Sequence, residues 1–216
     1  MAQTIGFIGG TGPEGKGLAA RFALAGMEVI LGSRSTERGQ EAANDVLSVS
    51  GGTVRGATNE ETARSSDIIV LTVPYSGLAD TLGGLVDAIG DKIVVSAVVP
   101  LQFAKGRVTM LGVEEGSASE QAQRILANAK VVGAYHNLAA GHLIDVEHAM
   151  EGDVLVCGDD ADAVRQVIWL SEQIRDLRGV NCGPLSSSHY IEGVTALLIN
   201  INRNYKKESG VQIVGI

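Results

Sequence analysis

The sequence predicts a doubly wound α/β fold, in which a parallel sheet carries helices on both faces. Short apolar runs rich in β-branched residues alternate with longer runs of helix-forming residues. A glycine-rich loop follows the first apolar run directly, and 45% of the 216 residues are hydrophobic. Apolar runs of this kind suit strands that are buried on both sides, and the alternation suits helices that connect parallel strands.

The alternation runs through the first 136 residues. We expect strands at residues 4–8, 28–31, around Val54, and at 67–73, 92–96 and 130–136. We expect helices at residues 16–25, 36–49, 59–65, 78–89 and 121–129. Gly26 and Gly51 are suitable helix ends, and Ser117 with Glu120 has the spacing of a capping box.

The alternation loosens after residue 135, and the remainder is predicted to form a smaller C-terminal α/β annex. Strands are expected at 153–157 and 178–181, and Asp160 can cap a helix at 161–174. A last helix at 190–201 carries one apolar stripe, which could fill the annex core, line a cleft or form a subunit interface. The stripe consists of Tyr190, Val194, Leu197, Leu198 and Ile201. Because the alternation changes at residue 135, the predicted domains are 1–135 and 136–216.

Composition excludes several classes of function. The net charge is −8, from 17 basic and 25 acidic residues, so nucleic-acid binding is not expected. Cys157 and Cys182 cannot make a disulfide framework, and neither resembles a catalytic thiol. The N-terminus does not have the pattern of a signal peptide, and no apolar run reaches the ~20 residues of a membrane span. We therefore expect a cytoplasmic protein.

A run of potential metal ligands lies in the loosened region. His142, Asp145, Glu147 and His148 fall within seven residues, but they lack the i, i+4 spacing of helical metal ligands. We interpret them as a solvated loop and expect no metal.

The loop from Gly10 to Gly15, with the sequence Gly-Thr-Gly-Pro-Glu-Gly, matches the G-x-G-x-x-G pattern of dinucleotide sites. It lies between the first strand and the first helix, as that mechanism requires. Gly10 would allow the tight turn, Gly12 the close approach of a pyrophosphate, and Gly15 the packing of the helix on the strand. The helix N-terminus then faces the anion, so the loop predicts a dinucleotide site.

The end of the second strand indicates which dinucleotide. Enzymes for NAD carry Asp or Glu there, which binds the ribose 2′-hydroxyl, whereas this chain has Gly32, Ser33 and Arg34. Arg34, with Ser33 and with Arg38 one helical turn later, could bind a 2′-phosphate. The alternative is that Arg34 and Arg38 are solvated surface residues without a ligand. The spacing favours NADP.

An ordered set of segments resembles the NADPH-dependent reductases of the deazaflavin coenzyme F420. The likeness covers nearly the whole chain, at residues 8–17, 31–34, 71–75, 92–96, 156–160, 183–185 and 197–200. It implies reversible hydride transfer between C4 of the nicotinamide and C5 of the deazaflavin, which binds in a cleft below the annex. The protein would accelerate this transfer by holding the nicotinamide and deazaflavin rings in the right geometry, so no catalytic nucleophile is expected.

The resemblance also assigns residues. It implies that the pyrophosphate contacts Thr11, Gly12, Pro13 and Glu14, the 2′-phosphate contacts Ser33, Arg34 and Arg38, the ribose and nicotinamide contact Val73, Gly77, Val99 and Ala140, and the deazaflavin lies near His136, Asn137 and Leu138. Tyr75 and Arg38 depart from the family's Trp and Lys, which puts contacts to the ligands in question but not the chemistry.

Two other functions stay open at this point. The phosphate loop would also suit an NADP-dependent reductase of a small imine, keto acid or hydroxyacid, or an NADP-sensing module without catalysis. A homodimer is expected, because about 80 residues after the main sheet are few to cover both a cleft and the last helix. Arg203, Lys206 and Lys207 could contact the acidic tail of the coenzyme or form a solvated helix end.

Overall fold

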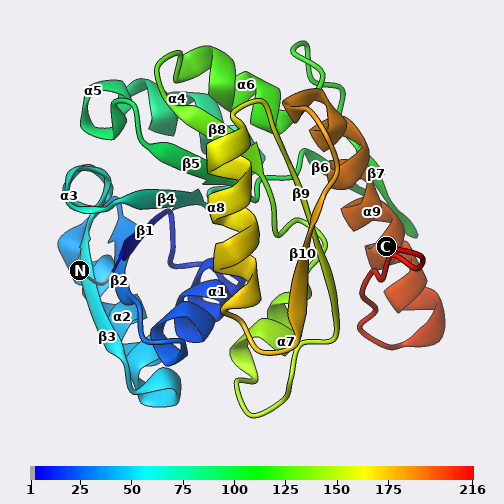
Figure 1. Ribbon diagram of the computed structural model, residues 1–216, viewed down its shortest axis with the longest axis horizontal. Helices are drawn as coiled ribbons and strands as arrows, with labels where there is room; N and C mark the ends of the chain where they lie inside the picture. The colour runs from blue at the N-terminus through cyan, green and yellow to red at the C-terminus, as the bar shows by residue number, and fades with distance from the viewer. Residues whose placement is uncertain (1–2) are drawn as a thin grey trace.

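The computed structural model describes residues 3–216 as a sheet between two layers of helices (Figure 1). The strand order is β10-β9-β8-β5-β4-β1-β2-β3, and all neighbours are parallel except β8 and β9. The predicted doubly wound α/β fold is confirmed, with this one antiparallel pair as the difference. The strands are β1 (Thr4–Ile8), β2 (Glu28–Ser33), β3 (Thr53–Thr58), β4 (Ile68–Leu71), β5 (Ile93–Ser96), β8 (Lys130–Gly133), β9 (Gly152–Gly158) and β10 (Leu177–Asn181).

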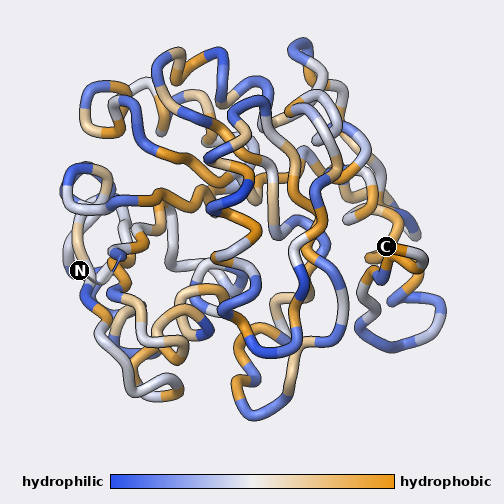
Figure 2. The backbone as a smooth tube through the Cα atoms, viewed as in Figure 1, coloured by the Kyte–Doolittle hydropathy of each residue, from blue (hydrophilic) through white to orange (hydrophobic). Residues whose placement is uncertain are grey.

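Alternate strand residues supply the two halves of the core. Phe7 and Val70 pack on one face, while their neighbours Ile8 and Leu71 pack on the other. Figure 2 shows the central strands as the most hydrophobic part of the backbone. The first face is covered by α1 (Pro13–Leu24), α2 (Thr36–Ser50) and α8 (Ala161–Glu172), and the second by α3 (Asn59–Ser65), α4 (Leu78–Gly83), α5 (Val86–Ile89) and α6 (Ala118–Ile125).

The C-terminal residues extend the main sheet. β9 pairs with β8, so the strands of the expected annex join the same sheet directly. The last helix, α9 (Ser188–Tyr205), packs against β9 through Ile191, and the chain then returns to β9, where the Asp153 amide donates to the Val211 carbonyl at 2.8 Å. The division into domains 1–135 and 136–216 stays a prediction.

Several elements differ from the sequence expectation. The expected helix at 78–89 is divided into α4 and α5, because Gly83 and Gly84 are poor helix formers, and η1 (Tyr75–Gly77) precedes it. α1 begins at Pro13, since proline is well tolerated in the first helical turn. Further elements that the sequence analysis missed are the hairpin of β6 (Leu101–Ala104) and β7 (Arg107–Met110), α7 (Ala140–Ile144) and η2 (Leu185–Ser187).

Two capping predictions are confirmed. The Ser117 hydroxyl accepts a hydrogen bond from the Glu120 amide at 3.0 Å, and the Asp160 carboxylate accepts one from the Ala163 amide at 2.8 Å.

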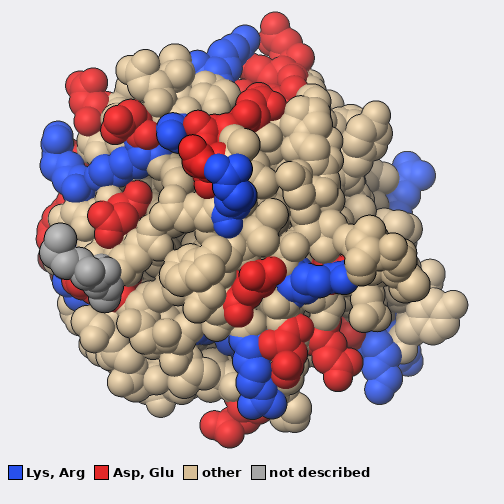
Figure 3. All heavy atoms as spheres, in the orientation of Figure 1, with Lys and Arg blue, Asp and Glu red and all other residues tan. Residues whose placement is uncertain are grey.

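The surface carries charges of both signs. On the face drawn in Figure 3, basic and acidic side chains are interspersed with uncharged surface. Among residues 3–216, no helix combines the length and apolar character that crossing a bilayer would require.

Candidate functional site

The glycine-rich loop connects the end of β1 to the start of α1. Gly12 is the N-cap residue of α1, and a Cβ atom at this position would meet no other atom within 4 Å. The space in front of Gly12 is therefore open to a ligand. A Cβ atom at Gly15 would lie 2.8 Å from the Gly10 Cα, so only glycine lets the helix approach the loop this closely.

One detail of the loop differs from the prediction. The residue with left-handed backbone is Gly9, with φ of +72°, and not Gly10. Gly10 is restricted by packing instead, because a Cβ atom there would approach the Phe7 and Leu31 side chains to 2.7 and 2.6 Å. The turn therefore needs glycine at both positions, at Gly9 for its backbone conformation and at Gly10 for space.

A first cleft, of about 550 Å³, lies in front of this loop. Its walls come from the glycine loop, the start of α2 and the segment after β4. Arg34 and Arg38 lie at one side of it, both exposed and neither in an ion pair with any residue among 3–216. The predicted residues that line it are Thr11, Gly12, Pro13, Glu14, Arg34, Arg38, Val73 and Gly77.

A second cleft, of about 450 Å³, lies beside the first. Glu14, Thr72, Val73 and Pro74 line both clefts, so the two share one wall at the start of α1 and the end of β4. The predicted residues that line the second cleft are Glu14, Val73, Val99, His136, Asn137, Leu138 and Ala140.

His136 is the most unusual side chain of the second cleft. It is buried, and neither ring nitrogen has a hydrogen-bond partner among residues 3–216. Burial lowers the pKa of His136 to about 3, so its imidazole is uncharged at neutral pH. A neutral imidazole offers one donor and one acceptor, and both are available here to a ligand.

Asn137 has a different role from its neighbour. Its amide donates to the Asp153 carbonyl at 2.7 Å and accepts from the Leu155 amide at 3.4 Å. The side chain thus ties the segment after β8 to β9, although Asn137 also lines the second cleft.

Glu14 occupies the shared wall. Its Oε1 atom is buried and has no hydrogen-bond partner among residues 3–216. Burial raises the pKa of this carboxyl to about 8, which leaves it mostly protonated at pH 7.

Some predicted residues do not line either cleft. Gly10 and Gly15 pack against each other at the two ends of the loop, and Ser33 is buried at the end of β2. Cys157 is buried, and desolvation raises its thiol pKa to about 12, which makes it a poor nucleophile. Arg203 is exposed on α9 and does not line the second cleft, although its neighbour Asn202 does.

Three residues of the run of histidines and acids, His142, Asp145 and His148, line a third cleft of about 470 Å³ beside α7 and the returning C-terminus. This cleft adjoins the second one, with which it shares Asn137, Leu138, Ala139, Glu208 and Ser209. His148 pairs with Asp145 at 2.7 Å, and His142 lies 3.5 Å from Glu208. Across residues 3–216, no group of three or more His, Cys, Asp or Glu side chains is placed to hold a metal ion.

Sequence reasoning missed part of both clefts. The Asn59 side chain lines the first cleft and accepts a hydrogen bond from the Gly9 amide at 3.2 Å. α9 and the segment after it line the second cleft. A cleft wall was one of the roles left open for the apolar stripe, and Leu198 of the stripe does line this cleft. The lining residues from α9 and the segment after it are Thr195, Leu198, Ile199, Asn202, Glu208 and Ser209.

Comparison with known proteins shows the family of this chain. Residues 4–100 match the model of the family described as NADP oxidoreductase, coenzyme F420-dependent. An F420-dependent NADP reductase of Methanothermobacter thermautotrophicus is 40% identical over 224 residues, covering 100% of this chain and 97% of the relative. One of Methanocaldococcus jannaschii is 37% identical, covering 98% of each chain. The chain belongs to the F420-dependent NADP reductase family.

A solved structure supports the fold of this family member. A putative F420-dependent NADP reductase from Arthrobacter sp. FB24 superposes with a TM-score of 0.86 at 23% identity, over 99% of this chain and 100% of that one. The names of the two relatives give NADP and coenzyme F420 as their redox partners. This member of the F420-dependent NADP reductase family has two clefts that share one wall.

Proposed function

We propose that this chain catalyses reversible hydride transfer between NADP(H) and the deazaflavin coenzyme F420. The observation that carries the proposal is the wall that the two clefts share, at Glu14, Thr72, Val73 and Pro74. Direct transfer requires two rings in contact, and a common wall brings two bound ligands to the same place.

The first cleft suits NADP. The N–H groups of the first turn of α1 have no partner within the helix, and together with the helix dipole they favour a pyrophosphate. Arg34 and Arg38, unpaired within residues 3–216, would hold the 2′-phosphate. Val73 and Gly77 would contact the ribose and the nicotinamide.

The second cleft suits the deazaflavin. Val99, Leu138 and Ala140 give it an apolar lining, and the uncharged His136 offers a hydrogen bond that no residue among 3–216 satisfies. With both ligands bound, the nicotinamide and deazaflavin rings supply the hydride chemistry themselves. The chain's part is to orient the two rings and to exclude water with apolar side chains such as Val98 and Leu198.

The proposal is tested by mixing the purified chain with NADPH under anaerobic conditions and adding coenzyme F420, FMN or FAD separately. We expect rapid loss of NADPH absorbance with coenzyme F420 and none with FMN or FAD, and NADH should be a poor donor. Binding of NADPH without any turnover would overturn the proposal. The result would then favour a reductase of a small imine, keto acid or hydroxyacid, or an NADP-sensing module.

A homodimer is part of the proposal. α9 leaves Tyr190 and Leu197 75% and 58% exposed, and Phe103 on the nearby hairpin is 73% exposed. α9 packs against β7 of that hairpin through Asn200, whose amide donates to the Val108 carbonyl at 2.8 Å (Figure 1). Large exposed apolar side chains on adjoining elements support a subunit interface.

A cytoplasmic location is also proposed. Cys157 and Cys182 are free thiols, which are typical of reducing compartments.

A further inference from the structure

Glu14 is an acid in an unusual place for a nucleotide site. It is the second residue of α1 and the last of the four residues that the resemblance assigns to the pyrophosphate, and it lines both clefts. A fixed negative charge here would repel the phosphates of a bound nucleotide.

The described residues, 3–216, provide no hydrogen-bond partner for the buried Oε1 atom of Glu14. No cation among residues 3–216 lies within ion-pair distance of the carboxyl, and Oε1 accepts no hydrogen bond from any of them. The nearest residue with a cation on α1, Lys16, is paired with Asp45 at 2.8 Å. A buried polar atom without a partner in a native protein requires an explanation, and an absent ligand is one.

The protonated form of Glu14 resolves the conflict with the phosphates. Burial raises the pKa of the carboxyl to about 8, so at pH 7 it is mostly an uncharged acid with one O–H donor. We propose that Glu14 acts as a carboxylic acid that donates a hydrogen bond to an oxygen on the nicotinamide half of bound NADP(H). This inference rests on the proposed function and assigns Glu14 a positioning role at the point where the two clefts meet.

The position of Glu14 in the shared wall is the reason to assign its hydrogen bond to the nicotinamide half of the nucleotide and not to the adenosine half. Arg34 and Arg38 lie in the first cleft but not in the second, so they fix the adenosine end away from the shared wall. The nicotinamide end must reach the second cleft for hydride transfer, and Glu14 lies on that path. NADP(H) offers phosphate, ribose and carboxamide oxygens there as acceptors.

The other titratable groups that face the clefts would not produce the same pH dependence. Besides Arg34 and Arg38 in the first cleft, His136 has a pKa of about 3, and burial raises the pKa of Tyr75 above its usual value of 10. Glu208 lines the second cleft from the C-terminal segment and is exposed. The 2′-phosphate of the ligand titrates near pH 6. Loss of affinity between pH 7.5 and 9.5 would therefore report on Glu14.

The experiment measures the dissociation constant of NADPH from pH 6.5 to 9.5 by titration of the full chain and of two variants. In the wild type, binding should weaken above pH 8, approaching tenfold per pH unit, because the ligand binds the protonated carboxyl. Glu14→Gln keeps a donor and cannot ionise, so its dissociation constant should not change with pH over this range. Glu14→Leu lacks the donor and should bind several-fold more weakly at pH 7, also without pH dependence.

The matched ligand is 2′,5′-ADP, which contains the 2′-phosphate but lacks the nicotinamide half. At pH 7, where Glu14 is mostly uncharged, its affinity should be the same for all three proteins, which also shows that the variants are folded. The inference is overturned if Glu14→Gln retains the pH dependence of the wild type, or if Glu14→Leu binds NADPH as tightly as the wild type at pH 7. A wild type that binds 2′,5′-ADP but reduces no F420 with bound NADPH would contradict the proposed function alone.

Discussion

Arg21 Nε, on the last turn of α1, donates a hydrogen bond to the Leu143 carbonyl of α7 at 2.9 Å. The other guanidinium nitrogens donate to the carbonyls of His142, Asp145 and His148 at 2.6 to 2.8 Å. Arg21 is 3% exposed, so this one buried guanidinium provides hydrogen-bond donors for four backbone carbonyls in and after α7. The helix that begins at the phosphate loop thereby fixes the segment that lines the second cleft.

We predict that Arg21→Lys impairs use of coenzyme F420 more than use of NADPH. A lysine ammonium cannot reproduce the planar fork that reaches four carbonyls, so α7 and the adjacent wall at Leu138 and Ala140 should loosen. The KM for coenzyme F420 should rise several-fold, while the KM for NADPH should change less than twofold. Steady-state kinetics with each substrate varied in turn measure both constants.

The matched control for this variant is Arg165→Lys on α8, where the arginine is exposed and pairs with Asp162. It should leave both constants unchanged. Equal increases of both KM values in Arg21→Lys would show a general loss of structure rather than a local effect on the second cleft.

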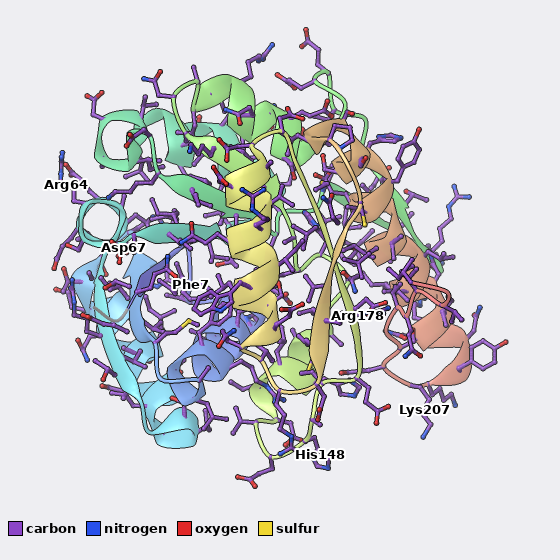
Figure 4. All side chains as sticks on the ribbon, in the orientation of Figure 1. Phe7, Arg64, Asp67, His148, Arg178 and Lys207 are labelled. Atoms are coloured by element: carbon purple, nitrogen blue, oxygen red, sulfur yellow. The ribbon has the colours of Figure 1, made fainter. Side chains whose placement is uncertain are left out.

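We predict that Arg34→Ala combined with Arg38→Ala removes the preference for NADPH. A hydrogen bond to a charged group contributes about 1.5–3 kcal/mol, so the loss of even one such bond corresponds to at least a tenfold effect. The KM for NADPH should rise by at least tenfold and that for NADH should change little. Arg64→Ala is the control, because Arg64 lies at the edge of the molecule in Figure 4, pairs with Glu60 and does not line the first cleft. Equal effects on both nucleotides would refute the assignment.

The parts of the fold that follow local rules could be predicted from the sequence. Apolar runs gave β1, β4 and β5 to within a few residues, and caps such as Ser117 and Asp160 gave helix starts. The hairpin of β6 and β7 was missed, since its strand at 101–104 is largely exposed and has no buried apolar run. Its stability comes from pairing and from α9, which are tertiary contacts.

The candidate site divides in the same way. The glycine loop and Arg34 follow from spacing along one β-α unit, so both are readable from sequence. The burial of Glu14, the bond from Gly9 to Asn59 and the approach of Glu208 to the second cleft depend on elements far apart in the chain. No local pattern predicts these contacts, because each needs the complete sheet to bring its partners together.

We predict that Asp153→Asn destabilises the chain by about 1–3 kcal/mol, since hydrogen bonds to a charged group are lost or weakened. The Arg178 guanidinium donates two hydrogen bonds to the buried Asp153 carboxylate, each at 2.8 Å, and reaches the Ile213 carbonyl at 2.7 Å. Figure 4 places Arg178 on β10 beside the returning C-terminus. Urea denaturation at pH 7 measures the free energy of unfolding.

The same pair should make stability depend on pH in the acid range. Hydrogen bonds from Arg178 hold the pKa of Asp153 below its usual value, so the stabilisation is present above about pH 4 and is lost as pH falls through the lowered pKa. The difference between wild type and Asp153→Asn should therefore shrink below pH 4. Asp162→Asn, at an exposed pair, should show little difference at any pH. A constant difference for Asp153→Asn from pH 3 to 7 would contradict the prediction.

We predict that Leu197→Glu converts a homodimer into a monomer. Leu197 is 58% exposed on α9, and a charge buried in an apolar interface without a partner strongly opposes association. Light scattering should give twice 22.4 kDa for the wild type and about half of that mass for the variant. Leu24→Glu is the control, because Leu24 is similarly exposed at the end of α1, and its mass should equal that of the wild type. A monomeric wild type at micromolar concentration would refute the dimer, and a dimeric Leu197→Glu would exclude this face of α9 from the interface.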